Sequence, residues 1–195
     1  TGVHISNIYG RDNDSMGGYF QSSYYYPSIY TTVDFVNAKR DNPVKTEVHY
    51  DPNLYTTKIL NYSSKDGTII PMYITYKKGI DLKGNNPTIL TGYGGFGINN
   101  APGYSYSNIL FFDNGGILAA PLIRGGGELG EEWHKAGKRL KKQNSIDDFI
   151  AAADYLVNEG YTTRGRLAIQ GGSNGGLLVA AAMMQRPDLC KVVIA

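Results

Sequence analysis

The chain has 195 residues, of which 42% are hydrophobic, so it can bury one substantial core. Its formal charge of +2 is close to balanced and indicates no nucleic-acid partner. No apolar run is long enough to span a bilayer, so we expect no membrane partner, and the single cysteine, Cys190, allows no internal disulfide and is expected to fill a buried apolar position.

Both ends of the sequence predict a piece of a longer protein. The chain starts at Thr1 instead of a methionine, and residues 192–195 have the composition of the middle of a buried strand. We expect a cytoplasmic location, with a periplasmic or secreted one left open because a signal peptide could precede Thr1.

Residues 1–50 are rich in tyrosine and alternate between strand-like and turn-like composition. We expect strands at residues 19–26 and 29–35, and a sheet this small needs partners to be stable. A polar, proline-marked connection over residues 41–52 predicts a domain boundary near residue 50. The second domain, residues 51–195, opens with a hairpin, because strand-like residues 55–62 and 68–76 flank the turn pair Asp66 and Gly67.

From Pro87 onward, short apolar runs alternate with helical stretches, which is typical of a parallel sheet in an α/β fold. The expected strands are residues 88–91, 116–120, 167–169 and 192–194. Apolar residues recur at helical spacing over residues 146–157, with Asn144 or Ser145 as the N-cap and Gly160 just past the end. The lysines over residues 135–142 are expected to form the solvated face of a helix.

Residues 166–181 have the pattern of a strand, a glycine-rich turn that carries Ser173, and a helix that continues to Pro187. This is the pattern of a nucleophile elbow, in which Gly171, Gly175 and Gly176 would allow close backbone approach and Ser173 would be raised clear of the sheet. The alternative is a tight turn with an incidental serine.

An acyl-transfer serine needs donors for the oxyanion, and in an α/β-hydrolase fold one of them is the backbone N–H after the nucleophile, here Asn174. The glycine-rich segment 92–97 follows the strand at residues 88–91 and carries Tyr93, whose phenol can donate a hydrogen bond without carrying charge. A packing tyrosine in a tight turn is the alternative.

Other chemistries find no support in the sequence. The glycine run at residues 124–130 lacks the phosphate-binding ending and spacing, and three scattered histidines show no metal-ligand pattern, so no cofactor and no metal are predicted. All of the histidines precede Ser173, whereas the triad in this fold runs serine, acid, histidine, and only Asp188 follows. We therefore expect the catalytic acid and base to lie outside these residues.

The chain resembles the prolyl oligopeptidase family over about residues 20–195. The resemblance rests on residues 92–96, 123–128, 132–137, 142–149 and 171–178, which occur in the family's order and spacing. It implies an α/β-hydrolase sheet, doubly wound and mostly parallel, after the closing part of a β-propeller in residues 1–50.

The resemblance also implies roles for particular residues. Ser173 would be the nucleophile, the Tyr93 O–H and the Asn174 N–H the oxyanion donors, and Phe96 with Asn174 the lining of the pocket for the residue before the cut. The implied partners are short proline-containing peptides, cut after proline, and the missing remainder of the chain, which would supply the rest of the propeller and the triad Asp and His. Tyr93 and Asn174 favour the proline-cleaving branch over related oligopeptidases.

Two alternatives stay open at this point. One is another peptidase or esterase of the same fold. The other is an inactive hydrolase-fold remnant, and the 195-residue chain alone is expected to be inactive because an unassisted serine hydroxyl is a weak nucleophile.

Overall fold

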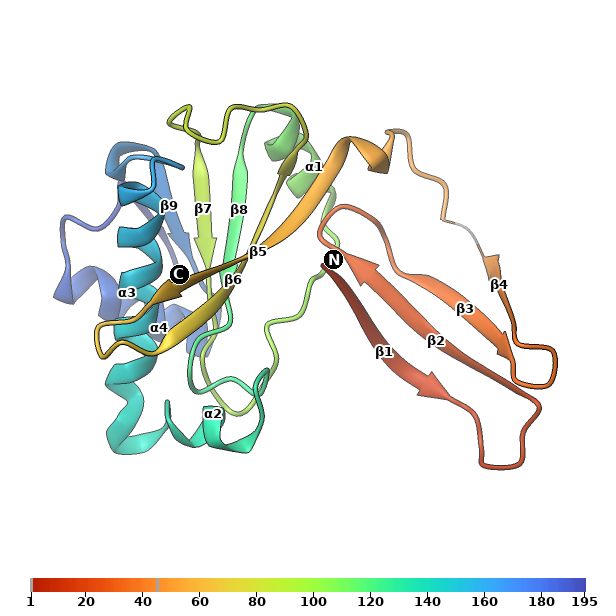
Figure 1. Ribbon diagram of the computed structural model, residues 1–195. Helices are drawn as coiled ribbons and strands as arrows, with labels where there is room; N and C mark the ends of the chain where they lie inside the picture. Colours follow the sequence, from red (N-terminus) through yellow and green to blue (C-terminus); the bar gives the residue numbers. More distant parts are fainter. Residues whose placement is uncertain (1, 45) are drawn as a thin grey trace.

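A computed structural model describes residues 2–44 and 46–195, and within these residues the strands form two sheets (Figure 1). The first sheet is antiparallel, and its strands lie side by side in the order in which they occur along the chain. They are β1 (Val3–Tyr9), β2 (Met16–Ser23), β3 (Ile29–Asp34) and β4 (Lys39–Val44). The strands expected at residues 19–26 and 29–35 are thus present, although the first lies a few residues earlier, at β2.

β4 corrects one expectation, because residues 41–43 belong to a strand and not to a connection. Pro43 misled the sequence reading, since proline cannot donate to a central ladder. β4 lies at the edge of its sheet and pairs only with β3 among the described strands, so a residue without an N–H is tolerated there. The boundary expected near residue 50 stays a prediction; the sheets divide between β4 and β5.

The second, central sheet has the order β10-β9-β7-β8-β6-β5. Its strands are β5 (Tyr55–Ser63), β6 (Ile69–Lys77), β7 (Thr88–Thr91), β8 (Ile117–Pro121), β9 (Leu167–Gln170) and β10 (Val192–Ile194). β10, β9, β7 and β8 are parallel, as predicted, and the predicted hairpin adds β6 and β5 antiparallel to one side.

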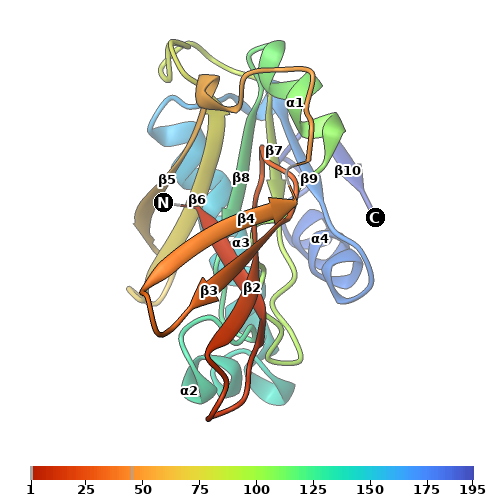
Figure 2. The same ribbon diagram turned by 90° about the vertical axis from the view of Figure 1, so that its right-hand side faces the viewer.

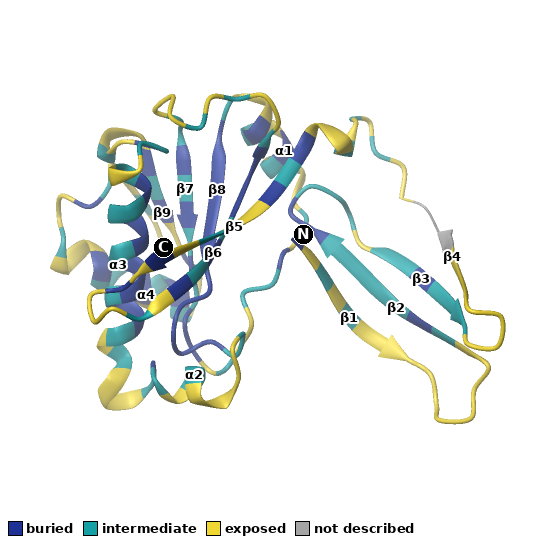
Figure 3. Ribbon diagram, viewed as in Figure 1, coloured by how far each residue is buried: buried dark blue, intermediate teal, exposed yellow. Residues whose placement is uncertain are grey.

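Helices cover both faces of the central sheet. The helical segments are η1 (Pro52–Leu54), α1 (Tyr106–Asp113), α2 (Glu131–Lys135), η2 (Arg139–Lys141), α3 (Lys142–Asn158), η3 (Arg164–Arg166) and α4 (Asn174–Gln185). β8 is buried along its whole length (Figure 3), and its alternating side chains show the two layers. Ile117 and Ala119 face the core under α3 and α4, whereas Leu118 and Ala120 face the core under α1.

The tyrosine-rich stretch packs onto the α1 face of the central sheet. Figure 1 shows the two sheets side by side, and in Figure 2 the β1–β4 sheet lies in front. Tyr24 is buried with its ring 6.3 Å from that of Tyr73, and Tyr25 lies 6.1 Å from Tyr55. Burying these rings supplies the apolar partner that such a small sheet needs.

The start of α3 differs from its prediction. The helix begins at Lys142, so Asn144 and Ser145 lie inside its first turn and neither is the N-cap. Their side chains instead donate to backbone carbonyls that precede the helix. Ser145 Oγ donates to the Arg124 carbonyl at 2.6 Å, and Asn144 Nδ2 donates to the Ala136 carbonyl at 2.9 Å. At the other end Gly160 follows the helix with φ of +79°, as expected.

The lysine run does not form one solvated helix face. Lys135 ends α2, Lys141 ends η2 and Lys142 begins α3. The helical path is interrupted at Gly137. A Cβ atom there would lie 2.2 Å from the Gly125 nitrogen, so the two backbone segments are in direct contact. Separating the lysines in this way gives each of them different surroundings.

A buried ion pair connects the hairpin to the helical layer. The Arg124 guanidinium donates to Asp148 on α3 at 2.6 Å and to Asp66 in the hairpin turn at 2.5 Å. Asp148 is fully buried and also accepts from Ser64 Oγ and the Arg124 backbone N–H. Each buried charge therefore has several partners, which offsets its desolvation.

Acid is expected to weaken this connection. The Arg124 guanidinium holds the pKa of Asp66 below its ordinary value, so Asp66 stabilises the fold above pH 4 or so and loses this effect as pH falls through its lowered pKa. Asp66→Asn should reduce the free energy of unfolding at pH 7 by about 0.5–1 kcal/mol, since the carboxylate is half exposed. In urea unfolding the difference from wild type should vanish in strong acid, and a constant difference would contradict it. The exposed Asp12→Asn is the control.

Two further observations bear on the remaining expectations. Cys190 is half-buried against the α3/α4 core cluster, and burial raises the pKa of its thiol. Over residues 2–44 and 46–195, no helix has both the length and the apolar character needed to cross a bilayer.

Candidate active site

Ser173 occupies a strained turn between β9 and α4. Its φ of +55° and ψ of −118° lie in a region that residues with a Cβ avoid. The side chain is exposed, and within the described part of the chain its Oγ has no hydrogen-bond partner. The local geometry is that of a nucleophile elbow: the backbone strain raises the hydroxyl at the carboxyl edge of the parallel strands.

Two glycines make this turn possible. A Cβ atom at Gly171 would lie 2.2 Å from the Gly175 carbonyl oxygen, and one at Gly175 would lie 2.5 Å from the Gly92 carbonyl oxygen. The expectation for Gly176 was wrong, because a Cβ there would meet only the Gly171 oxygen at 3.6 Å, an ordinary contact. Gly176 already lies within α4, past the point where the backbones cross.

These distances predict opposite effects for neighbouring glycines. Gly175→Ala should lower the free energy of unfolding by about 1–3 kcal/mol, because backbone on both sides must move to admit the methyl group. Gly176→Ala is the matched control and should be neutral or stabilise by up to about 1 kcal/mol, since alanine favours a helix interior. Urea unfolding of both variants checks this, and equal effects would contradict it.

The segment after β7 lies against the elbow. β7 and β9 are parallel neighbours with Thr91 beside Gln170, so the residues that follow them leave the same edge of the sheet together. The side-chain Nδ2 of Asn174 donates to the Tyr93 carbonyl. A Cβ atom at Gly95 would lie 2.5 Å from that same Nδ2, so a larger residue there would displace the Asn174 amide. Tyr93 and Asn174, the two predicted oxyanion donors, are far apart in sequence, and this contact brings their segments together beside Ser173.

Phe96 lies at the outer end of the same segment. It has a φ of +56°, and 76% of its surface is exposed. Its ring stacks on no other aromatic ring of the described residues. The structure therefore places Phe96 on the loop that carries Tyr93, with its apolar ring open to solvent.

No described histidine or carboxylate is hydrogen-bonded to Ser173. His134 lies on α2, half-buried over Gly97, with Nδ1 2.8 Å from the Gly125 carbonyl oxygen. Asp188 is exposed and accepts from Arg186 at 2.9 Å, which lowers its pKa to about 2. Both groups are thus engaged elsewhere.

Sequence reasoning missed Lys142. It was assigned to a solvated face, yet its Nζ lies 2.6 Å from the Gly94 carbonyl oxygen and 3.5 Å from Asn174 Oδ1. Burial lowers the pKa of this lysine. Lys142 opens the run of residues 142–149 on which the family resemblance rests, but that run does not reveal that its ammonium is withdrawn from solvent. Its place depends on how the start of α3 meets the segments that follow β7 and β9.

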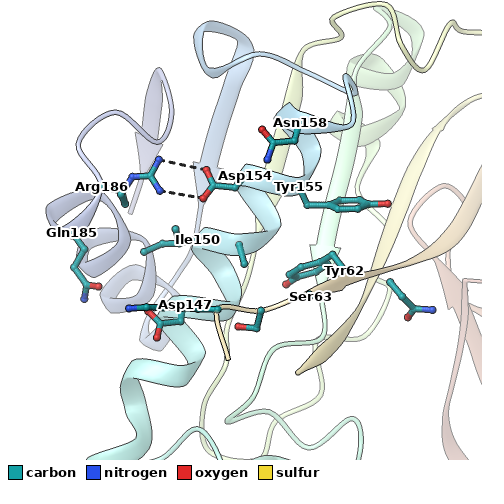
Figure 4. A pocket seen from close by; sticks show the side chains of 13 residues that line it. Tyr62, Ser63, Asp147, Ile150, Asp154, Tyr155, Asn158, Gln185 and Arg186 are labelled. Atoms are coloured by element: carbon teal, nitrogen blue, oxygen red, sulfur yellow. Dashed lines mark hydrogen bonds and ion pairs between the residues drawn. The ribbon is translucent and has the colours of Figure 1, made fainter. Parts of the chain in front are cut away.

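A hollow of about 820 Å³ lies between β5, α3 and the end of α4, away from the elbow (Figure 4). In it the Asp154 carboxylate binds Arg186 at 3.1 Å, and a further ion pair joins Asp154 to Arg164. Asp154 and Arg186 are thus paired with each other, and Asp147 accepts from the Gln143 side-chain amide at 2.9 Å. The described residues contain no cluster of three acidic, histidine or cysteine side chains that could hold a metal ion.

The parallel sheet, the strained serine between a strand and a helix, and the glycine-rich segment beside it define an α/β-hydrolase fold with a nucleophile elbow. The sequence profile of the prolyl oligopeptidase family matches residues 102–195. Together with the relatives described next, this match shows that the chain belongs to the prolyl oligopeptidase family.

Relatives of known name support the assignment. The prolyl endopeptidase of Elizabethkingia meningoseptica is 52% identical over 148 residues, which cover 76% of this chain and 21% of that protein. The prolyl endopeptidase of Dictyostelium discoideum is 53% identical over 144 residues, covering 72% of this chain and 19% of the relative. The chain therefore spans about a fifth of the length of these curated relatives.

Solved structures agree over nearly the whole chain. A prolyl endopeptidase structure superposes with a TM-score of 0.92 at 43% identity, covering 97% of this chain and 28% of that one. A post-proline cleaving enzyme from Rickettsia typhi has a TM-score of 0.88 at 34% identity, covering 98% and 28%. The predicted fold class, an α/β-hydrolase sheet after part of a propeller, is confirmed, with one antiparallel sheet of that propeller in the described residues.

Proposed function

We propose that the complete protein containing this chain is a serine endopeptidase that hydrolyses short peptides on the carboxyl side of proline. The observation that carries the proposal is the strained, exposed Ser173 at the elbow. Support comes from the relatives, which are named prolyl endopeptidases, and from a Galerina marginata prolyl oligopeptidase B bound to a 25-residue macrocyclization substrate.

The proposed reaction is acyl transfer in two steps. Ser173 Oγ attacks the carbonyl carbon of the proline residue and loses its proton to a general base, and the carbonyl oxygen becomes an oxyanion. The Tyr93 O–H and the Asn174 N–H would donate to this oxyanion. The amine then leaves with a proton, and water hydrolyses the acyl-enzyme to release the peptide acid and regenerate the serine.

The proline side chain would rest against Phe96 and Asn174. A pyrrolidine ring is apolar and carries no N–H within a peptide, so an exposed aromatic ring is a suitable surface for it. Phe96 is the exposed aromatic residue nearest to Tyr93 in the sequence, which supports this role.

Cleavage mapping tests the proposal. The complete protein is incubated with a peptide of about ten residues that contains one central proline, and the products are identified by mass spectrometry. We expect a single cut after proline and, with a fluorophosphonate probe, labelling of Ser173. Labelling without peptide cleavage would favour an esterase of the same fold, and absence of both would favour an inactive hydrolase fold.

The 195-residue chain by itself should not hydrolyse such peptides. Ser173 has no base among the described residues, and a serine hydroxyl without a positioned histidine is a weak nucleophile at neutral pH. A chromogenic prolyl peptide assay of the isolated chain checks this, with His134→Ala as control. Turnover that disappears in the control would show that His134 acts as the base.

A further inference from the structure

Lys142 has surroundings that are unusual for a lysine. It is the first residue of α3 and half-buried, and no carboxylate of the described residues forms an ion pair with it. Its ammonium instead faces two neutral oxygens, the Gly94 carbonyl at 2.6 Å and Asn174 Oδ1 at 3.5 Å. Partly burying a charge without a counter-ion is unfavourable unless something else is gained.

The two oxygens belong to the two halves of the candidate active site. Gly94 follows Tyr93 on the segment after β7, whereas Asn174 follows Ser173 at the elbow. Lys142 comes from a third element, α3, and contacts both. It therefore links the loop that carries the phenol donor to the turn that carries the backbone donor.

The Asn174 side chain completes this link. An ammonium has donors only, so it requires the amide oxygen of Asn174 and turns the amide nitrogen the other way. That nitrogen donates to the Tyr93 carbonyl. Lys142, Asn174, Tyr93 and Gly94 thus form a closed ring of polar contacts across the two segments. A Cβ atom at Gly95 would collide with this amide in the position it occupies.

We propose that Lys142 is a positioning residue for the oxyanion hole: it holds the Tyr93 segment against the elbow so that the Tyr93 O–H and the Asn174 N–H converge on one point. This inference rests on the proposed function and adds to it. Oxyanion donors are effective only when they are fixed before the reaction, because reorganisation during the reaction would cost part of the stabilisation.

The test compares Lys142→Met and Lys142→Arg in the complete protein. Lys141→Met is the matched control, because Lys141 is the neighbouring, exposed lysine at the end of η2. For each variant we measure kcat and KM with a prolyl peptide, the Ki of a peptide aldehyde ending in prolinal, and the thermal unfolding midpoint. The aldehyde adds to the serine as a hemiacetal whose oxygen occupies the oxyanion site, so it reports on the hole.

Lys142→Met should lower kcat by about 10- to 100-fold, the range for losing hydrogen bonds from a charged group, and leave KM within about twofold. The aldehyde Ki should rise by a similar factor, because both quantities report binding of the oxyanion. Lys142→Arg should recover most of the loss, and Lys141→Met should match wild type. A merely structural role would shift the unfolding midpoint without this parallel change.

Several outcomes overturn the inference. Wild-type kcat in Lys142→Met, or a lower kcat with an unchanged aldehyde Ki, would show that Lys142 does not position the hole. If Lys142→Met is unfolded at the assay temperature, Asn174→Ala decides, since it removes the contacted amide and keeps the backbone donor; unchanged kcat and Ki would then overturn the role. A wild-type protein that neither cleaves the peptide nor binds the aldehyde would refute the proposed function itself, which distinguishes the two failures.

Discussion

Ser173→Ala in the complete protein is expected to lower kcat for a prolyl peptide by about a millionfold and to leave substrate binding nearly unchanged. The hydroxyl is the group that would form the acyl-enzyme, and no described group is hydrogen-bonded to its Oγ, so the substitution removes the nucleophile without breaking an internal hydrogen bond. The backbone strain at φ of +55° is the same for alanine, and the fold should therefore persist.

The control for this variant is Ser63→Ala. Ser63 is also exposed, but it lines the hollow between β5 and α3 shown in Figure 4. It should retain wild-type kcat and fluorophosphonate labelling, whereas Ser173→Ala should lose both. Normal turnover in Ser173→Ala, or lost labelling in Ser63→Ala, would mean that the nucleophile lies elsewhere.

Tyr93→Phe is expected to lower kcat by about a hundredfold, equivalent to about 3 kcal/mol, with a much smaller change in KM. The reason is that a donor aimed at the oxyanion acts on charge that develops only in the transition state. The substitution keeps the ring, and the contact of Asn174 with the Tyr93 carbonyl involves only backbone at this residue. The loop should therefore retain its position.

Steady-state kinetics with a prolyl peptide measure this effect, and Tyr106→Phe serves as the control. Tyr106 begins α1 and is 66% exposed, so losing its hydroxyl should leave kcat unchanged. A loss of less than about threefold for Tyr93→Phe would show that Tyr93 acts by packing and not as a donor.

The elbow and the parallel strands show what local pattern can reveal. Short apolar runs bounded by turn residues predicted β7, β9 and β10, and the glycines around Ser173 predicted the turn, because these features depend on residues close in sequence. Tyr93 and Asn174 were predicted together because an α/β-hydrolase fold takes its oxyanion donors from the elbow and from a loop after an earlier strand, and in the structure these two segments follow the neighbouring strands β7 and β9.

Features that depend on contacts between distant residues were missed or misassigned. The sequence predicts a connection where β4 lies, because proline disfavours a central strand. Only the strand order, which depends on distant residues, shows that β4 is an edge strand that tolerates Pro43. Asn144 and Ser145 were read as helix caps, although their side chains bind carbonyls of the preceding loop. Gly175 and Gly176 look alike in sequence, but only Gly175 faces a second backbone segment at close range: a Cβ atom there would lie 2.5 Å from the Gly92 oxygen, against 3.6 Å from the Gly171 oxygen at Gly176.

The sequence by itself determined the class of fold and the glycine-rich turn that carries Ser173, because backbone conformation and hydrophobic period are encoded locally. The roles of Tyr93 and Asn174 as oxyanion donors followed from the family resemblance and stay predictions. The tertiary structure alone decided the place of Lys142, which contacts residues 48 and 32 positions away in the chain. A lysine in a run of lysines has the same composition whether it is solvated or buried. Only the packing of α3 against the edge of β7 and β9 removes this one from water and sets it between two carbonyl-type oxygens.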